Sequence, residues 1–503
     1  MNKHLSFILG LMALMLTCVS CNDFLEEHPK TFLSPDNYYT SQSQAQAAVN
    51  GLYTFLDDIF NGDIEVGTQR FIFIEYLSGY GIRPRAATTQ DFNQVMTHTI
   101  KEENTAVEAL WRTAYSAMEN CNSVIFGIEN ATAVMADDVR NQLLGEAYFM
   151  RAYFYFNLVR LWGEVPLKIT PTTDLKDVQL PLASQEEVYA QIVSDLETAE
   201  TCMTNLAWIR GDGHVGKGAV KTLLAKVYLT MAGYPLQKGS EYFTKAYQKA
   251  VEVSQSGAFS LFGSYADLRN PSNANAGEFI LSIQREADNA GSPVHNDMLP
   301  YPAPDKEISS NSAYGGALAP EYSFYTSYPT DDKRTEEQGY YYTEHMALDG
   351  SEMVQLGAPY IYKYWDSNAA ASGKSGMNYP LLRYADVLLM LAEAKVQADG
   401  GSTTDAAAIN AYYAVRNRAL PDEGKPTSIN FDMVYRERLW ELCFENQTYY
   451  DMLRTRKAMH CVTGSVVDLI GFQAPGHNAA FKEADLLLPY PQREKRLNPN
   501  LVR

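Results

Sequence analysis

Three segments of the chain place apolar residues at the spacing of an α-helix, and each is followed by a second helical stretch. The apolar positions run from Leu144 to Trp162, from Leu224 to Met231 and from Tyr384 to Leu391. The stretches that follow them are 185–205, 239–256 and 404–419. A helix pair can bury its apolar stripe only against neighbouring helices, so this pattern predicts a mostly α fold built from stacked helix pairs.

Two of these segments resemble the first helix of a tetratricopeptide repeat. Leu144-Gly145 is followed by Tyr148, and Leu224-Ala225 is followed by Tyr228, as in that repeat. Positions 144 and 224 are 80 residues apart, which is not a multiple of the repeat length of about 34. We therefore expect a tetratricopeptide-like scaffold whose array is interrupted.

The helical pattern breaks in two places, over 61–103 and over 257–380. The second break is rich in Pro, Gly, Asn and Ser, so it predicts a large loop-rich insertion. The single domain of 34–503 would then have its helical scaffold at about 34–256 and 381–503. Twelve of the chain's 34 tyrosines fall within 290–380. Aromatic residues in loops on a rigid scaffold are candidates for ligand recognition, and the alternative is that these rings pack the insertion onto the helices.

The overall charge excludes one large class of function. The chain of 503 residues carries 60 acidic and 41 basic side chains, which gives a formal net charge of −19. An acidic surface repels phosphate backbones, so no nucleic-acid partner is expected. Only one stretch, near the N-terminus, is apolar enough to consider as a membrane segment, which excludes a polytopic membrane protein.

The N-terminus indicates export. A short basic start precedes an apolar run from Leu5 to Leu16, which is too short to span a bilayer and is typical of a secretory signal. Ser20-Cys21 follows, and a small residue directly before a cysteine is the cleavage pattern of bacterial lipoproteins. We expect residues 1–20 to be removed as the signal peptide, Cys21 to be lipidated and residues 21–33 to form a tether. The alternative is ordinary cleavage and a freely secreted protein.

No motif for catalysis or metal binding stands out. The chain has neither H-E-x-x-H nor G-x-S-x-G, and its eight histidines are scattered. Residues 211–216 spell G-x-G-x-x-G, but helical sequence precedes them where a dinucleotide site needs a strand, so we interpret them as a turn before the helix at 216–232. The four cysteines beyond Cys21 are far apart, which indicates neither a disulfide scaffold nor a zinc site. We predict no metal, no cofactor and no enzymatic activity.

Four segments, in order and spacing, resemble the SusD/RagB family of outer-membrane nutrient-binding lipoproteins. They are Cys21–Glu26 with Pro29, Arg151–Leu167, Arg383–Ala394, and Glu437–Glu445 followed by Asp451–Arg454. The tail Leu488–Pro491 with Asn498–Leu501 also fits. We expect these motifs to stabilise the fold and not to carry out catalysis. The helix Arg151–Leu161 is apolar nearly all round and should be buried, and Arg383, Asp386 and Glu393 are expected to form ion pairs between helices.

The resemblance implies a function at the cell surface. It implies capture of an oligomeric nutrient, in most relatives a glycan, and delivery to a SusC-like TonB-dependent transporter on which the protein acts as a hinged lid. The implied location is the outer membrane, with a lipid anchor and the protein facing outside. Some relatives bind peptides, so a peptide-binding uptake lipoprotein is the alternative. A secreted glycoside hydrolase and a purely structural lid are further alternatives.

The resemblance also implies where ligand contacts lie, namely in the loop after the first helices and in the large insertion. The first loop supplies Tyr80, Arg83, Arg85, Asp91, Phe92 and Asn93, and the insertion supplies His295, Tyr301 and Tyr314. Sugar rings stack their C–H faces on aromatic rings, while their hydroxyls need polar partners at the rim. Among the five tryptophans only Trp365 lies in these two loops, so we expect a stacking platform made of Tyr and Phe.

Overall fold

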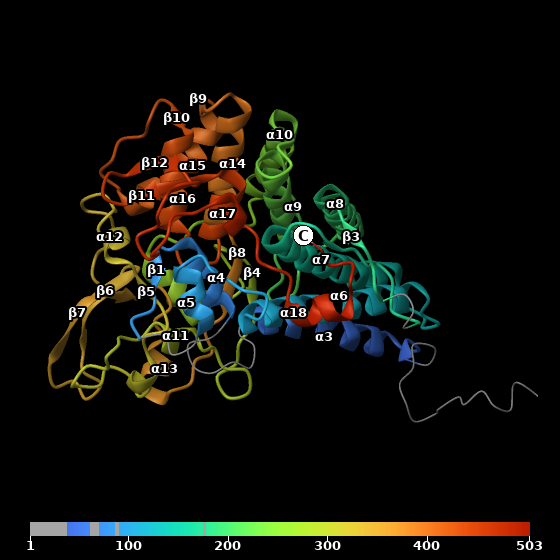
Figure 1. Cartoon of the computed structure of the whole chain (residues 1–503), viewed down its shortest axis with the longest axis horizontal. Coiled ribbons are helices and arrows are strands. Elements are labelled where there is room, and N and C mark those ends of the chain that lie inside the picture. Colours follow the sequence, from blue (N-terminus) through green and yellow to red (C-terminus); the bar gives the residue numbers. More distant parts are fainter. Residues whose placement is uncertain (1–37, 61–69, 86–89, 175–177, 503) are drawn as a thin grey trace, which may run out of the picture.

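The computed structural model describes residues 38–60, 70–85, 90–174 and 178–502, and helices are its main regular secondary structure (Figure 1). The signal peptide and tether expected at 1–20 and 21–33 lie outside these described residues. The helices are α3 Gln42–Phe60, α4 Arg70–Ser78, α5 Gln90–Met96, α6 Thr105–Glu129, α7 Asp137–Trp162, α8 Gln185–Cys202, α9 Lys217–Ala232, α10 Ser240–Ser254, α11 Val294–Asp297, α12 Tyr322–Tyr325, α13 Ser367–Ser372, α14 Tyr384–Ala398, α15 Ala406–Ala419, α16 Phe431–Glu441, α17 Thr448–Thr455 and α18 Gln492–Leu497.

The described strands form small two-stranded antiparallel sheets, which pair as β1–β5, β2–β3, β4–β8, β6–β7, β9–β10 and β11–β12. Their bounds are β1 Gly81–Ile82, β2 Val165–Pro166, β3 Leu182–Ala183, β4 Phe279–Ile283, β5 Ala319–Pro320, β6 Tyr341–Met346, β7 Met353–Ile361, β8 Tyr379–Arg383, β9 Ser402–Thr403, β10 Ile429–Asn430, β11 Lys457–His460 and β12 Ser465–Asp468. The predicted mostly α fold is confirmed.

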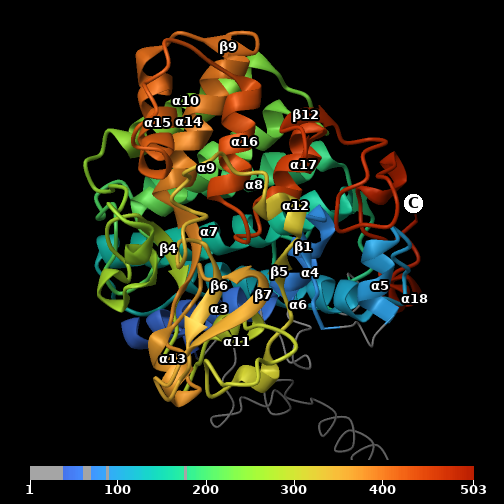
Figure 2. The same cartoon turned by 90° about the vertical axis from the view of Figure 1, so that its left-hand side faces the viewer.

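The helix pairs expected from the sequence are present. Helix α7 packs against α8, α9 against α10, and α14 against α15, while α10 also contacts α14 and joins two of the pairs. The predicted second stretches 185–205, 239–256 and 404–419 correspond to α8, α10 and α15. Figure 2 shows α9, α10, α14 and α15 gathered at one end of the molecule. The tetratricopeptide-like detail stays a prediction.

Helix α7 is buried as its all-round apolar sequence predicts. Two acidic residues stand in its first turn, where the positive end of the helix dipole favours them, and Gly163 ends it with a φ of +73°. Arg151, the most deeply buried basic residue of the helix, is 4% exposed and bonds Asp195 on α8 through Nε and Nη2 at 2.9 and 2.7 Å. Since both charges are paired, the helix can lie inside the scaffold.

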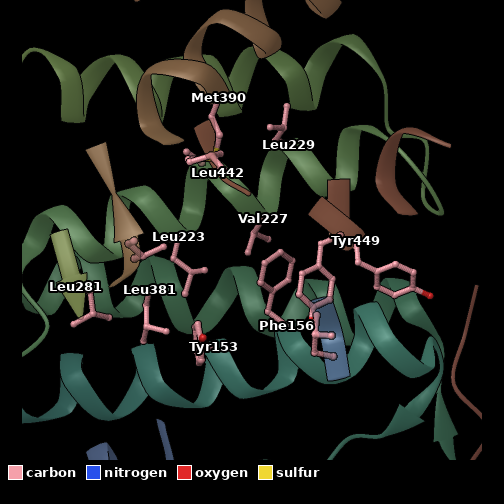
Figure 3. Close-up of a cluster of buried hydrophobic side chains, with 14 of the residues drawn as sticks. Tyr153, Phe156, Leu223, Val227, Leu229, Leu281, Leu381, Met390, Leu442 and Tyr449 are labelled. Atoms are coloured by element: carbon pink, nitrogen blue, oxygen red, sulfur yellow. The ribbon is translucent and has the colours of Figure 1, made fainter. Parts of the chain in front are cut away.

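The main core lies between α7, α9 and the C-terminal helices (Figure 3). Phe156 from α7 and Val227 from α9 face each other, and Tyr449 from α17 closes the same cluster. Leu281 of β4 and Leu381 of β8 reach into it as well. β8 lies at the end of the loop-rich insertion and β4 lies in its first part, so the pair anchors the insertion in the scaffold core.

Buried ion pairs hold the insertion further. Arg334 is fully buried and contacts Asp332 at 2.8 Å and Glu437 of α16 at 2.7 Å. Lys363 pairs with Glu445, beyond the same helix. Removing one partner of such a pair leaves an uncompensated buried charge, at a cost of about 3–5 kcal/mol. The pairs therefore fix how the insertion sits on the scaffold.

The ion pairs expected for the family motif residues are confirmed. They are Arg383 with Glu441 at 2.8 Å, Asp386 with Lys226 at 2.6 Å and Arg438 at 2.9 Å, and Glu393 with Arg454 at 2.7 Å. Burial alone would raise the pKa of Asp386, but Lys226 and Arg438 outweigh burial and lower the pKa to about 2. These groups are charged and paired, so they serve the fold.

Most tyrosines of the insertion are packing residues, as the alternative interpretation held. Eight of the twelve are buried, at 328, 340, 341, 342, 360, 362, 364 and 379. Several belong to a second core inside the insertion, which also contains Trp365. Only Tyr314 and Tyr322 are well exposed, at 52% and 63%. No helix among the described residues is long and apolar enough to cross a membrane.

Candidate functional site

The structure brings the two predicted ligand loops together. Strand β1, directly after α4, pairs with β5 of the insertion, with Gly81 opposite Pro320 and Ile82 opposite Ala319. Beyond the strand, the Arg85 backbone N–H donates to the Gly316 carbonyl at 3.1 Å. The chain after α4 therefore runs along 313–320, more than 200 residues away in sequence.

Arg85 organises the meeting point. Its Nε donates to the Gly315 carbonyl at 3.1 Å and its Nη2 donates to the Ala313 carbonyl at 2.7 Å. The guanidinium also lies 4.5 Å from the centre of the Tyr301 ring, a cation–π distance. Arg85 thus fixes the backbone on both sides of Tyr314 and covers one face of Tyr301. We call Arg85, Tyr301 and Tyr314 the shelf.

Two glycines allow the loops to approach so closely. A Cβ on Gly316 would lie 2.3 Å from the Tyr301 Cβ, and a Cβ on Gly315 would lie 2.5 Å from the Leu299 carbonyl oxygen. Gly316 also has a φ of +86°, which side-chain-bearing residues rarely adopt. The Gly-Gly pair noted beside Tyr314 is therefore required by the geometry of the shelf.

The exposed surface of the shelf comes from its tyrosines. The Tyr314 side chain is 52% exposed, and Tyr301 is half-buried. The Tyr360 hydroxyl donates to the Tyr301 carbonyl at 2.9 Å and accepts from its N–H at 3.3 Å, which fixes the backbone of Tyr301. An exposed ring beside a fixed guanidinium can stack on an apolar face and donate hydrogen bonds at its edge.

Three of the predicted contact residues are buried and act in packing. Tyr80 is 2% exposed, and its hydroxyl donates to the Met459 carbonyl at 2.9 Å. Phe92 is 4% exposed and meets Tyr76 edge-on at 5.6 Å between ring centres. His295 is 2% exposed, and burial lowers its pKa to about 4. In this structure these rings hold the two loops in place and offer little surface to a ligand.

The remaining predicted residues lie near the start of α5. The Asp91 carboxylate accepts from the Thr105 backbone N–H at 3.0 Å and so holds the beginning of α6. Asn93 is exposed on α5, and Arg83 is half-buried with its guanidinium 5.2 Å from the Phe92 ring centre. Asn93 is therefore exposed to solvent, whereas the Asp91 carboxylate already holds the start of α6.

One exposed aromatic residue was not singled out from the sequence. Tyr322 begins α12, directly after β5, and its side chain is 63% exposed. Glu321 caps this short helix by accepting from the Ser323 N–H at 2.7 Å, and its own N–H donates to the Tyr80 carbonyl at 2.8 Å. The sequence feature that could have identified Tyr322 is Glu321, an acidic residue directly before a segment rich in aromatic residues. Tyr314 and Tyr322 thus flank β5 in the sequence, and both side chains are exposed to solvent.

Comparisons with known proteins agree with this architecture. A family model described as the SusD family matches residues 237–503, and one described as starch-binding associating with outer membrane matches residues 23–229. The SusD-like protein P25 of Formosa agariphila is 24% identical, over 97% of this chain and 96% of its own length.

Solved structures extend the comparison to three dimensions. A SusD superfamily protein from Parabacteroides distasonis is 33% identical with a TM-score of 0.85, and the match covers 92% of this chain and 98% of that one. A structure with a xylogluco-oligosaccharide is 22% identical with a TM-score of 0.74, covering 91% and 97% of the two chains. Surface glycan-binding protein A from Bacteroides uniformis is 21% identical with a TM-score of 0.74, covering 92% and 99%. With a family model over more than half of its length and a relative one-third identical over nearly all of it, the chain belongs to the SusD family.

Proposed function

We propose that this protein binds an oligomeric glycan at the cell surface, without altering it, and delivers it to a SusC-like TonB-dependent transporter. The observation that carries the proposal is the shelf, where a fixed arginine lies beside one half-buried and one exposed tyrosine ring. Such a surface matches the C–H face and hydroxyl edge of a sugar ring. Relatives of the same fold, one solved with a xylogluco-oligosaccharide, support a glycan as the ligand class.

Within this proposal the shelf residues have different roles. Tyr314 stacks on the sugar, Tyr301 and Arg85 form the adjoining wall, and Asn93 is the polar rim. We propose that Tyr322, on the other side of β5, contacts a neighbouring sugar unit of the same oligomer. Tyr80, Phe92 and His295 support these loops from inside.

The direct test is calorimetry of the purified protein with panels of oligosaccharides and peptides. We expect an oligosaccharide to bind and Tyr314→Ala to weaken it at least fivefold, about 1 kcal/mol, because the truncated ring is a central contact. Tyr413→Ala on α15, away from the shelf, is the matched control and should keep full affinity. Binding of peptides alone would favour the peptide-uptake alternative, and turnover of a glycan would defeat the non-catalytic proposal.

The location and partner need separate tests. We propose that Cys21 is lipidated, that the protein faces outward on the outer membrane, and that it works as a lid on the transporter. The family description associating with outer membrane supports this location. Cys21→Ala should move the protein from the membrane fraction to the soluble fraction. Affinity purification of the native protein should bring down a TonB-dependent barrel, and recovery of the protein alone would contradict the partnership.

A further inference from the structure

A cavity lies in the helical scaffold, on elements that do not contribute to the shelf. It measures about 240 Å³ and lies where the end of α7, the start of α8, the turn after α9 and helix α17 meet. This size is just below the ~300–1,000 Å³ typical of small-molecule sites. The cavity therefore fits one small ring, such as a single sugar, and not an oligomer.

Arg160 gives this cavity its chemical character. Its guanidinium is sandwiched between the rings of Phe156 and Tyr450, at 3.8 and 3.5 Å from their centres. Its Nε donates to the Phe156 carbonyl at 3.0 Å, and its Nη2 donates to the Asn157 side-chain oxygen at 2.7 Å. Among the described residues no carboxylate forms a salt bridge with it, in contrast to Arg151 and Arg454. Burial lowers the pKa of Arg160, and the nearby tyrosines and the Asp451 carboxylate oppose this shift only in part.

Another part of the cavity wall is an exposed ring. Tyr234 is 40% exposed and lines the cavity, and the Arg456 guanidinium lies 4.8 Å from its ring centre. The charge of Arg456 is already balanced by Glu483, at 3.0 Å. Gln185, at the start of α8, adds a side-chain amide to the lining. Arg454, Arg456 and Glu483 also line the cavity, but each of them is salt-bridged, so Arg160 is the cation of the lining that has no salt-bridged carboxylate among the described residues.

Backbone contacts fix the turn that carries Tyr234 against α17. The Tyr234 N–H donates to the Arg454 carbonyl at 2.8 Å. A Cβ on Gly233 would lie 2.3 Å from that same carbonyl oxygen, so only glycine permits the contact. Little reordering is then needed for a ligand to enter, which favours affinity.

We propose that this cavity binds a small monoanionic molecule the size of one sugar ring, with a carboxylate at Arg160 and the ring against Tyr234. A guanidinium that has no salt-bridged carboxylate and lies at the edge of a cavity favours an anion as the group that binds beside it. The aromatic wall and the amide of Gln185 then recognise the neutral part of the molecule. The site is independent of the shelf and of the function proposed for it.

The test uses D-glucuronate as the probe and D-glucose as its neutral counterpart, with affinities measured calorimetrically on the full chain. We expect glucuronate to bind at least tenfold more tightly than glucose. Arg160→Gln, which keeps polar atoms but removes the charge, should lower glucuronate affinity by about tenfold or more, and Tyr234→Ala should lower it several-fold. Arg269 is also half-buried, ring-stacked and bonded to carbonyls, so Arg269→Gln is a matched control that should leave affinity unchanged.

Two further variants keep the proposal falsifiable. Because Arg160→Gln removes packing as well as charge, Gln185→Glu tests the same cavity from its rim, where an added negative charge should weaken glucuronate binding. Tyr314→Ala at the shelf should leave glucuronate affinity unchanged while weakening the oligosaccharide. Equal affinity for glucuronate and glucose would overturn the proposal. So would loss of glucuronate binding in Tyr314→Ala together with full binding in Tyr234→Ala.

Discussion

Glu75 is a buried carboxyl group in the last turn of α4, just before the chain enters the shelf. It is 3% exposed and accepts a hydrogen bond from the Asn446 backbone N–H. Burial raises its pKa to about 8, nearby Glu445 adds to the rise, and the Asn446 N–H and Lys363 only partly oppose it. The folded protein should therefore hold a proton on Glu75 at pH values where the unfolded chain has released it.

The difference between the folded and unfolded pKa of Glu75 sets the sign and size of its effect on stability as the pH changes. The unfolded value is 4.5, so between pH 4.5 and about 8 the folded state binds more protons than the unfolded state. Stability then falls as the pH rises through this window, by up to about 5 kcal/mol at ~1.36 kcal/mol per pKa unit. In Glu75→Gln the amide oxygen still accepts from Asn446, but the titrating proton is gone. The variant should match the wild type near pH 5 and exceed it by a few kcal/mol at pH 8.

The assay is denaturant unfolding of wild type and Glu75→Gln at pH 5, 6.5 and 8. Comparing the two proteins at each pH cancels every other titrating group. Glu352→Gln, at an exposed position, corrects for the loss of one acidic group. A difference between wild type and Glu75→Gln that stays constant from pH 5 to pH 8 would refute the reasoning.

Three further predictions concern stability and the shelf. Gly316→Ala should weaken glycan binding and cost about 1–3 kcal/mol, because its Cβ meets Tyr301, whereas Gly350→Ala, with positive φ but open space, should spare binding in the same titration. Arg151→Met should cost about 3–5 kcal/mol in denaturant unfolding by leaving its carboxylate partner buried and unpaired; a loss under 1 kcal/mol contradicts this. Burial lowers the pKa of His477 to about 4, so stability should fall by up to about 3 kcal/mol from pH 6.5 to 4, and His477→Gln should abolish that part of the fall.

The helical scaffold was predictable because its signals are local. The apolar spacing in α7 and α9 is set within each helix, and Gly163 and Gly233 stand just past their ends. The ion pairs of Arg383 and Asp386 were also predictable in kind, since charged residues in or directly before a buried helix must be paired. Their partners were not predictable, because they lie on other helices far along the chain.

The exposure of single aromatic residues was not predictable. Tyr301 and Tyr342 look alike in sequence, yet Tyr342 is 1% exposed because it sits in the β6–β7 hairpin against Trp365. The pairing of β1 with β5 joins two strands of two residues each, which leave no periodic signal. Arg85 was assigned to the site by resemblance alone, and the structure supplies the physical reason, which is its bonds to the backbone on both sides of Tyr314.

The arginines of this protein fall into two groups, those paired with carboxylates and those bonded only to neutral oxygens. Arg334 and Arg383 are buried among carboxylates, and their salt bridges hold the insertion to the scaffold. Arg85 and Arg160 bond instead to carbonyl or amide oxygens and stack on rings, so their positive charge remains available to a ligand. A guanidinium group that has no carboxylate partner in the protein attracts anions or other hydrogen-bond acceptors from solution. This distinction predicts that charge-removing substitutions at Arg334 act on stability, whereas those at Arg85 and Arg160 act first on two different ligands.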